Sequence, residues 1–142
     1  MPVILDTNVV SEMIRPRIDP NVDRWLSEQD ESELFLTTIT EAELLFGPPG
    51  MPQGPIRDAY IAAMDRILFV DFADRILPFD RSAANSYPRI RAAREAIGRR
   101  IDDADCFIAA IAESVGASVA TRNVRDFVGC GVEVINPWEY SP

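Results

Sequence analysis

Acidic side chains stand at positions in this sequence where they could carry out chemistry together. They lie at or shortly after the ends of predicted strands, or at the start of the most regular predicted helix: Asp6, Glu41, Glu43, Asp102, Asp103, Asp105 and Asp126. In an open parallel sheet, ligands bind beyond the carboxyl ends of the strands, so these acids could meet at one edge. Carboxylates that close repel one another unless a cation lies between them. The hard cations Mg²⁺ and Mn²⁺ take oxygen ligands and can assist phosphodiester hydrolysis.

The basic residues narrow the possible chemistry further. All 14 of them are arginine, against 23 acidic residues, and the chain contains neither lysine nor histidine. This composition excludes Schiff-base lysines, the lysine of a phosphate-binding P-loop, imidazole bases and histidine-ligated zinc. The formal charge of −9 also argues against a protein that holds long duplex nucleic acid by neutralising its phosphates. An enzyme of this composition has to rely mainly on carboxylates.

The elements that would position these acids follow from the apolar pattern. Short runs typical of strands occupy residues 3–5, 34–39, 76–79, 118–121 and 132–135. Helical spacing is found at residues 8–13, 20–29, 40–47, 56–69, 82–97 and 102–115. Strands that alternate with helices predict an α/β fold with a central, mainly parallel sheet and helices on both faces. A Pro/Gly-rich loop is predicted at residues 47–55.

Length and composition indicate how this chain is organised. A chain of 142 residues without repeats or low-complexity tracts is predicted to form one domain, residues 1–142. No apolar stretch is long enough for a membrane helix and the N-terminus lacks signal-peptide features, so a cytoplasmic protein is expected. Cys106 and Cys130 lie in apolar surroundings without metal-binding spacing, which predicts buried thiols.

Each acid also has a purely structural interpretation. Asp6 could cap the helix that follows it. Glu43 could form a capping box with Thr40, and the three acids within residues 102–105 could complement the dipole of their helix. Asp126 could cap a turn or pair with a neighbouring arginine. Taken one at a time, none of these acids identifies a function.

Four segments, taken in order, resemble one known protein family. They are VILDTNVVSE, TTITEAELLFG, DDADCFIAAIAESVGASVATRNVRDF and VINPWEY, and the similarity runs over nearly the whole chain. Together they resemble PIN-domain ribonucleases, and most closely the VapC/FitB-type toxins of bacterial toxin–antitoxin operons. The resemblance implies a small PIN-like α/β fold, an acidic pocket that binds Mg²⁺ or Mn²⁺, and metal-dependent cleavage of single-stranded or loop RNA.

The resemblance also implies which acids form the metal site. Carried over by position, they are Asp6 in LDTN, Glu43 in AEL, Asp105 in ADCFIAA and Asp126 in TRNVRDF. Glu43 is preferred to Glu41 because it directly precedes the Leu-Leu-Phe-Gly run. Asp105 is preferred to the two acids before it because an Ile-Ala-Ala triplet follows it at the family spacing.

The fourth acid is the open position of this site. Some relatives carry the fourth acid where this chain has Asn123, and others carry it where this chain has Asp126. Asn123 could hold a metal-bound water. Asn8 and Thr121 are expected to orient the carboxylates without binding the ion directly. In the expected mechanism Asp6, Glu43 and Asp105 hold the ion directly. Asp126 binds a second ion or reaches the first through water. The ion lowers the pKa of a water, whose hydroxide attacks the scissile phosphorus in line.

Contacts to RNA and to other proteins complete these expectations. Because the chain has no lysine, phosphates have to be met by metal ions or by arginines near the predicted site, namely Arg15, Arg17, Arg122 and Arg125. The resemblance implies a cognate VapB-type antitoxin, whose basic or apolar C-terminal segment would cover the acidic pocket. It also implies a homodimer and a toxin–antitoxin hetero-oligomer.

Two other functions are compatible with parts of the sequence. The segment from Asp6 to Val10 is similar to the nucleophile loop of haloacid-dehalogenase-like phosphatases, although Asn8 replaces the second acid and no phosphate-holding lysine exists. The chain could also be a binding-only, acidic PIN-like partner protein without nuclease activity. A stabilising response to Mg²⁺ or Mn²⁺ would separate this second alternative from a metal-dependent nuclease.

Overall fold

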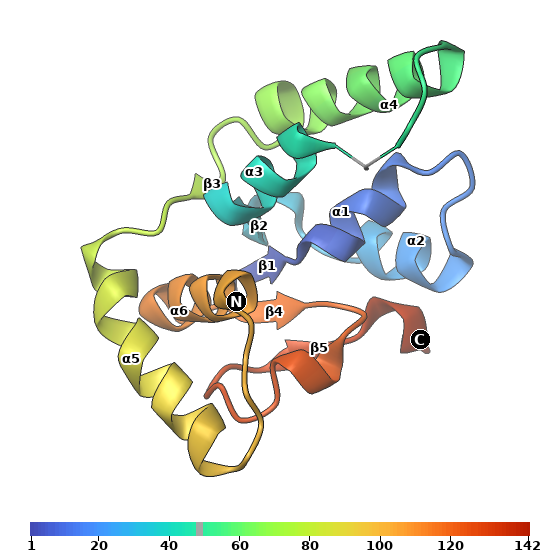
Figure 1. Cartoon of the computed structure of the whole chain (residues 1–142). Coiled ribbons are helices and arrows are strands. Elements are labelled where there is room, and N and C mark those ends of the chain that lie inside the picture. Colours follow the sequence, from blue (N-terminus) through green and yellow to red (C-terminus); the bar gives the residue numbers. More distant parts are fainter. Residues whose placement is uncertain (48–49) are drawn as a thin grey trace.

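The computed structural model of the chain describes residues 1–47 and 50–142 and contains a central five-stranded sheet (Figure 1). Its strands are β1 (Val3–Leu5), β2 (Leu34–Thr37), β3 (Ile76–Leu77), β4 (Ser118–Ala120) and β5 (Val134–Ile135). They lie in the order β3-β2-β1-β4-β5, and every neighbouring pair is parallel. The predicted α/β fold with a parallel sheet is confirmed.

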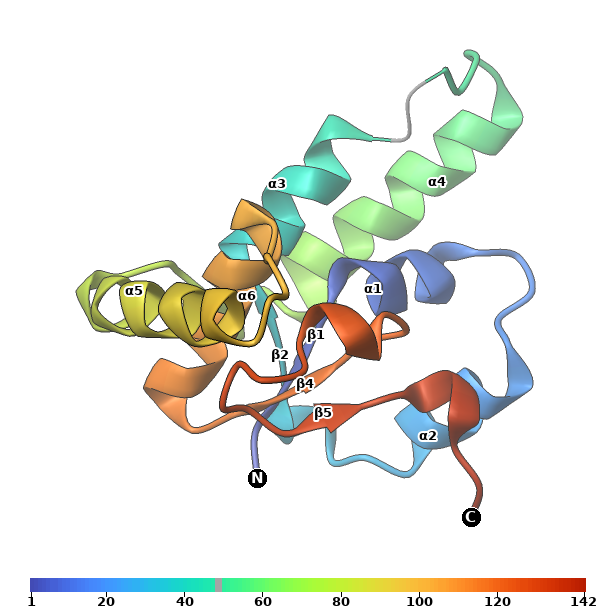
Figure 2. The same cartoon turned by 60° about the horizontal axis from the view of Figure 1, so that its bottom comes forward.

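Helices cover both faces of this sheet, as Figure 2 shows from a second direction. They are α1 (Thr7–Ile14), α2 (Pro20–Ser27), α3 (Thr38–Phe46), α4 (Pro55–Arg66), α5 (Arg81–Ala96) and α6 (Asp103–Val115). Successive side chains of a strand point to opposite faces of a sheet. Accordingly, Ile4 of β1 packs in a core with α5 and α6, whereas Val3 and Leu5 pack in a second core with α1 to α4.

The junction between β2 and α3 differs from the prediction. β2 ends at Thr37 instead of residue 39, and α3 begins at Thr38. The Thr37 hydroxyl accepts a hydrogen bond from the backbone N–H of Thr40 at 3.2 Å, so Thr37 is the N-cap. The capping box considered for Thr40 and Glu43 is therefore wrong, because Thr40 already lies inside the helix.

Two other helices differ from the sequence pattern in informative ways. A proline inside a helix removes a backbone hydrogen bond, yet α5 continues through Pro88. The carbonyl of Ala84, which loses its helical partner there, belongs to an exposed residue that water can reach. On α6 the apolar residue Val115 is 46% exposed, whereas Ala109 and Ala110 are buried. The helix is enclosed on more than one side because it packs between α5 and the sheet.

The remaining predictions concern loops, thiols and membranes. Of the predicted loop 47–55, residues 48–49 lie outside the described residues, and α4 already begins at Pro55. A π-helical turn (Ile67–Asp71) follows α4. Cys106 and Cys130 are buried free thiols, as predicted. Within residues 1–47 and 50–142, none of the helices combines the length and apolar character needed to cross a membrane.

The parallel arrangement determines which segments meet beyond the sheet. β1 and β4 are neighbours, and each of them ends at the same edge because they run in the same direction. The residues that directly follow them, Asp6 and Thr121, therefore emerge side by side. Helix α3 starts directly after β2, the other neighbour of β1, which brings its residues to the same edge.

Candidate active site

Asp6 follows β1 and is buried at the carboxyl edge of the sheet, with 6% of its surface exposed. Its backbone N–H donates to the carbonyl of Ala120 at 2.9 Å, which fixes the end of β1 against β4. The side-chain Oδ1 accepts from the N–H of Thr7 at 2.8 Å, so Asp6 does cap α1. Oδ2 is not used by the cap. The structural and the functional interpretation of Asp6 are compatible because they use different oxygens.

Thr121 and Asn8 hold the second oxygen of Asp6. Thr121 is buried, and its Oγ1 donates to Asp6 Oδ2 at 2.8 Å. Asn8 donates from Nδ2 to Thr121 Oγ1 at 3.2 Å and to Asp6 Oδ2 at 3.4 Å, while its Oδ1 accepts from the N–H of Arg122 at 3.2 Å. These bonds join the segments after β1 and β4 and leave the carboxylate in one orientation.

Glu43 reaches the same region from α3. Its Oε1 accepts a hydrogen bond from the hydroxyl of Thr7 at 2.7 Å. The Thr7 hydroxyl also lies 2.9 Å from that of Thr40, which is buried. Thr7 follows Asp6 directly, so one residue of α1 contacts two of the acids that the sequence singled out.

Asp105 lies in the first turn of α6, and its environment disfavours the charged form. Burial and the negative charges of Asp6, Asp126, Asp102 and Glu43 raise its pKa from 3.8 to about 7. The pKa of Asp6 is also raised, chiefly by burial, although the hydrogen bond from Thr121 opposes the rise. Carboxyl groups that shift one another in this way lie close enough to interact electrostatically.

A hollow of about 380 Å³ joins these groups, and we call it the acidic hollow. Its lining comprises Asp6, Thr7, Asn8, Ser11, Glu12, Glu43, Asp105, Arg122, Asn123 and Trp138. Glu41, Asp102 and Asp103 are not part of it. Asp102 is instead the residue before α6, and Asp103 pairs with Arg91. The hollow therefore brings together three of the acids predicted for the site.

Asp126, the fourth predicted acid, lies beside the acidic hollow but does not line it. It belongs to a short 3₁₀-helix, η3 (Val124–Asp126), where it is exposed. Asn123, the alternative at this position, lines both the acidic hollow and the neighbouring hollow that Asp126 lines. The charge of Asp126 still contributes to the raised pKa values of Asp6 and Asp105.

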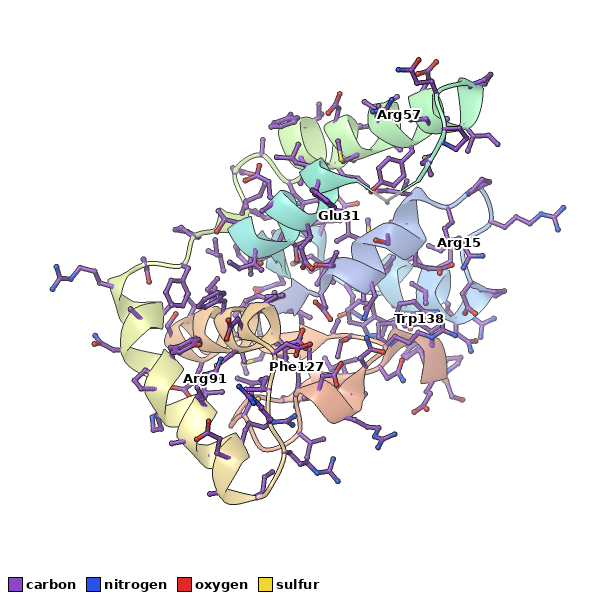
Figure 3. All side chains as sticks on the ribbon, in the orientation of Figure 1. Arg15, Glu31, Arg57, Arg91, Phe127 and Trp138 are labelled. Atoms are coloured by element: carbon purple, nitrogen blue, oxygen red, sulfur yellow. The ribbon has the colours of Figure 1, made fainter. Side chains whose placement is uncertain are left out.

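Of the predicted RNA-contacting arginines, Arg122 is the best placed. It lines the acidic hollow and lies over the ring of Trp138, 5.3 Å from the ring centre. Figure 3 shows Trp138 near this edge of the sheet and Arg15 at the end of α1. Arg15 pairs with Glu12 at 3.1 Å. Arg17 is exposed and lines another hollow, which shares Glu12, Arg122 and Trp138 with the acidic hollow.

Four residues of the acidic hollow were not predicted as site residues from the sequence: Thr7, Ser11, Glu12 and Trp138. Glu12 is buried, accepts from the N–H of Asp19 at 2.8 Å and fixes the chain between α1 and α2. Nothing in a helical segment reveals that one of its acids turns inward to a backbone N–H. Trp138 belongs to the 3₁₀-helix η4 (Pro137–Glu139), and only its aromatic side chain next to Pro137 distinguished it in the sequence.

Comparisons with known proteins identify the family of this chain. The family model for the PIN domain matches residues 3–128. The VapC ribonuclease Y4jK of Sinorhizobium fredii is 39% identical, covering 96% of this chain and 98% of the relative. Toxin FitB of Neisseria gonorrhoeae is 37% identical, covering 96% of this chain and 98% of the relative. A solved structure of FitAB bound to a DNA fragment superposes with a TM-score of 0.89 at 36% identity, covering 99% of this chain and 98% of that one. The chain thus belongs to the PIN-domain family.

Proposed function

We propose that the protein is a VapC-type ribonuclease, the toxin of a toxin–antitoxin pair, which hydrolyses single-stranded or loop RNA with Mg²⁺ or Mn²⁺. The relatives named a VapC ribonuclease and a toxin, similar over nearly the full length, support this class of activity. The observation that carries the proposal for this chain is that Asp6, Glu43 and Asp105 line one hollow, the acidic hollow. An RNA substrate also makes the cytoplasm its expected place of action.

The donor chemistry of the acidic hollow fits a hard divalent cation. Carboxylates, an amide and hydroxyl groups supply oxygen donors, and the chain has no imidazole that would favour a softer metal. In the part of the chain that the structure describes, no three acidic or cysteine side chains already stand together as ligands of one ion. Repulsion between uncompensated carboxylates favours such a spread arrangement. The ligands we propose are Asp6, Glu43 and Asp105, with Asp126 or Asn123 as the outer member.

The residues of this chain have separable roles in the proposed reaction. When bound, the ion supplies positive charge that lowers the pKa of a water and stabilises charge developing on the phosphate. Asp6 offers Oδ2 in an orientation fixed by Thr121 and Asn8. Thr7 positions Glu43 by a hydrogen bond. Arg122 presents a guanidinium, which suits a phosphate, at the rim of the same hollow.

We propose a VapB-type antitoxin and a second copy of the chain as partners. The solved structure of FitAB, whose chain resembles this one at 36% identity, supports a two-component assembly. Large apolar side chains also remain exposed on α3, α4 and the turn that follows α4: Leu45, Phe46, Ile56, Ile61, Phe69 and Val70. Exposed apolar groups of this extent are typical of protein–protein contact surfaces.

The direct test of the proposed function is cleavage of RNA by the purified wild-type protein. We expect single-stranded RNA to be cut in the presence of Mg²⁺ or Mn²⁺ and to remain intact in EDTA, because in the proposed reaction the ion is needed to activate the attacking water. Products are followed on a denaturing gel, with a hairpin RNA and a phosphomonoester as further substrates. Hydrolysis of the phosphomonoester alone would support the phosphatase alternative, and inactivity on every substrate would support the binding-only alternative.

Replacing Thr121 by Val tests whether Thr121 acts through Asp6. Valine has nearly the shape of threonine but cannot donate to Asp6 Oδ2, so the pKa of Asp6 should rise further. We expect kcat to fall by about 10–100-fold, and the pH profile to move to higher pH. KM for RNA should stay unchanged. Thr121→Ser, which keeps the hydroxyl, should restore the pH profile, whereas equal profiles for both variants would contradict the role.

A further inference from the structure

A second hollow lies beside the acidic hollow and is built largely from arginine. It has a volume of about 860 Å³, and we call it the arginine hollow. Its lining comprises Arg94, Arg99, Arg100, Arg122, Asn123, Val124, Arg125, Asp126, Asn136 and Glu139. Arg122 and Asn123 line both hollows, so the two hollows are adjacent. A ligand that leaves the acidic hollow past these two residues reaches the arginine hollow.

The charge of this hollow is opposite to that of the molecule. The chain carries −9 overall, yet five of its 14 basic residues gather here against two acids, Asp126 and Glu139. Across the described residues, none of these five arginines forms an ion pair, whereas Arg15, Arg66, Arg75, Arg89 and Arg91 do. Unpaired guanidinium groups keep their full charge for a ligand. A polyanion that is repelled elsewhere on the surface is attracted here.

Arg94 shows that this hollow is constructed and not a chance gathering of surface side chains. It is 3% exposed, and its Nε has no hydrogen-bond partner among the described residues. Its Nη1 donates to the carbonyls of Arg125 at 3.0 Å and Val128 at 2.6 Å, and its Nη2 donates to that of Arg100 at 3.4 Å.

These partners of Arg94 are neutral carbonyls, so its positive charge stays uncompensated beneath the hollow. A buried charge without a counter-ion is costly, and such a residue is retained where its charge or its bonds are used. Here the bonds fasten the two separate segments that carry Arg100 and Arg125. Arg94 is thus a positioning residue for the exposed arginines around it.

We propose that the arginine hollow binds the phosphates of single-stranded RNA that flank the bond cut in the acidic hollow. Arg99, Arg100 and Arg125 contact those phosphates, and Arg122 lies at the boundary between the two hollows. This proposal rests on the proposed ribonuclease function. Guanidinium groups bind phosphate oxygens in a bidentate manner, and several of them along one path match the repeated charge of an RNA strand. Attraction here offsets the repulsion that the acidic hollow exerts on the same substrate.

The test compares two pairs of arginines with the same total charge. Arg99→Gln/Arg100→Gln removes two exposed arginines from the hollow. The control Arg57→Gln/Arg81→Gln removes two exposed arginines from α4 and from the opposite end of α5; Figure 3 shows Arg57 far from Trp138. Both pairs are made in the wild type for cleavage and in an Asp6→Asn background for binding. Affinity for a fluorescent single-stranded RNA is measured by anisotropy between low and high salt.

We expect the hollow variant to bind RNA about tenfold more weakly near physiological salt, with the slope of log affinity against log salt reduced by about 1.4, from two lost phosphate contacts. Cleavage should show the same loss in kcat/KM, mostly through KM. The control pair should retain the wild-type slope. Equal losses in both pairs would overturn the proposal, because they would reflect overall charge alone. Unchanged RNA affinity with weakened binding of an acidic peptide would overturn it as well.

Failure of the ribonuclease function would give a different result from failure of this proposal. If the wild type cuts no RNA, the proposed function fails, and the salt slope of binding still reports on the arginine hollow. If the wild type cuts RNA and the hollow variant matches it in affinity, slope and kcat/KM, only the arginine hollow is refuted. Circular dichroism of both double variants establishes that they are folded, as expected for changes at exposed positions.

Discussion

Asp6→Asn is expected to abolish metal-dependent RNA cleavage while leaving the fold intact. Asparagine caps helices as well as aspartate does, so its Oδ1 can still accept from the N–H of Thr7. What is lost is the negative charge at the position of Oδ2, which we propose binds the ion. The rate should fall by more than the roughly 10–100-fold that is typical of residues which merely orient metal ligands. Initial rates on single-stranded RNA with saturating Mg²⁺ measure the effect.

A matched control separates this loss from a general effect of removing one charge. Asp65→Asn makes the same chemical change on α4, at an exposed residue outside both hollows. Its rate should stay at the wild-type level, and thermal melting should show both variants folded. Wild-type activity in Asp6→Asn would contradict the role given to Asp6, whereas inactivity in both variants would show that the assay responds to overall charge.

The sequence was most informative about the strands and the residues that directly follow them. The segments 3–5 and 118–121 were predicted as short strands, and in the structure their parallel pairing places Asp6 and Thr121 together at one edge. Asp6 was harder to interpret because capping and metal binding seemed to compete. In the structure the helix cap uses Oδ1, which accepts from Thr7, while Oδ2 accepts from Thr121, so capping does not conflict with the metal-binding role that we propose for Oδ2.

Sequence reasoning was weakest where tertiary contacts decide the outcome. The Thr-x-x-Glu pattern at Thr40 indicated a capping box, but Thr37 had the better geometry at the end of β2 and became the cap. This leaves Glu43 to accept from Thr7, a contact 36 residues away along the chain. The arginine hollow was missed for the same reason. Arg99 and Arg100 lie in a polar turn after α5, and only the folded chain brings them beside Arg122 and Arg125.

Asp105 predicts an unusual dependence of stability on pH in the metal-free protein. Its pKa is raised from 3.8 to about 7 in the folded chain. Between these two pH values the folded state holds a proton that the unfolded state releases, so the stability contributed by Asp105 falls as pH rises from about 4 to 7. Above the pKa of the folded state, the loss of folding stability caused by the ionised Asp105 has its full size. A pKa shift of this size corresponds to about 4 kcal/mol, and screening by water at this partly exposed residue reduces the cost to about 2 kcal/mol.

Asp105→Asn should therefore stabilise the protein at neutral pH while impairing catalysis. In EDTA at pH 8 we expect its melting temperature to lie about 5–10 °C above that of the wild type, and at pH 4 the difference should shrink. Mg²⁺ should raise the melting temperature of the wild type at pH 8 and have little effect on the variant, because binding to the native state stabilises it.

Asp103→Asn is the control, since Asp103 lies in the same helical turn but pairs with Arg91 outside the acidic hollow. If Asp105→Asn melts at or below the wild-type temperature at pH 8, the ionised carboxylate of Asp105 does not destabilise the metal-free protein, which contradicts the prediction. A wild type that shows no Mg²⁺ response would favour a binding-only protein, because the same repulsion that destabilises clustered carboxylates is what a bound cation relieves.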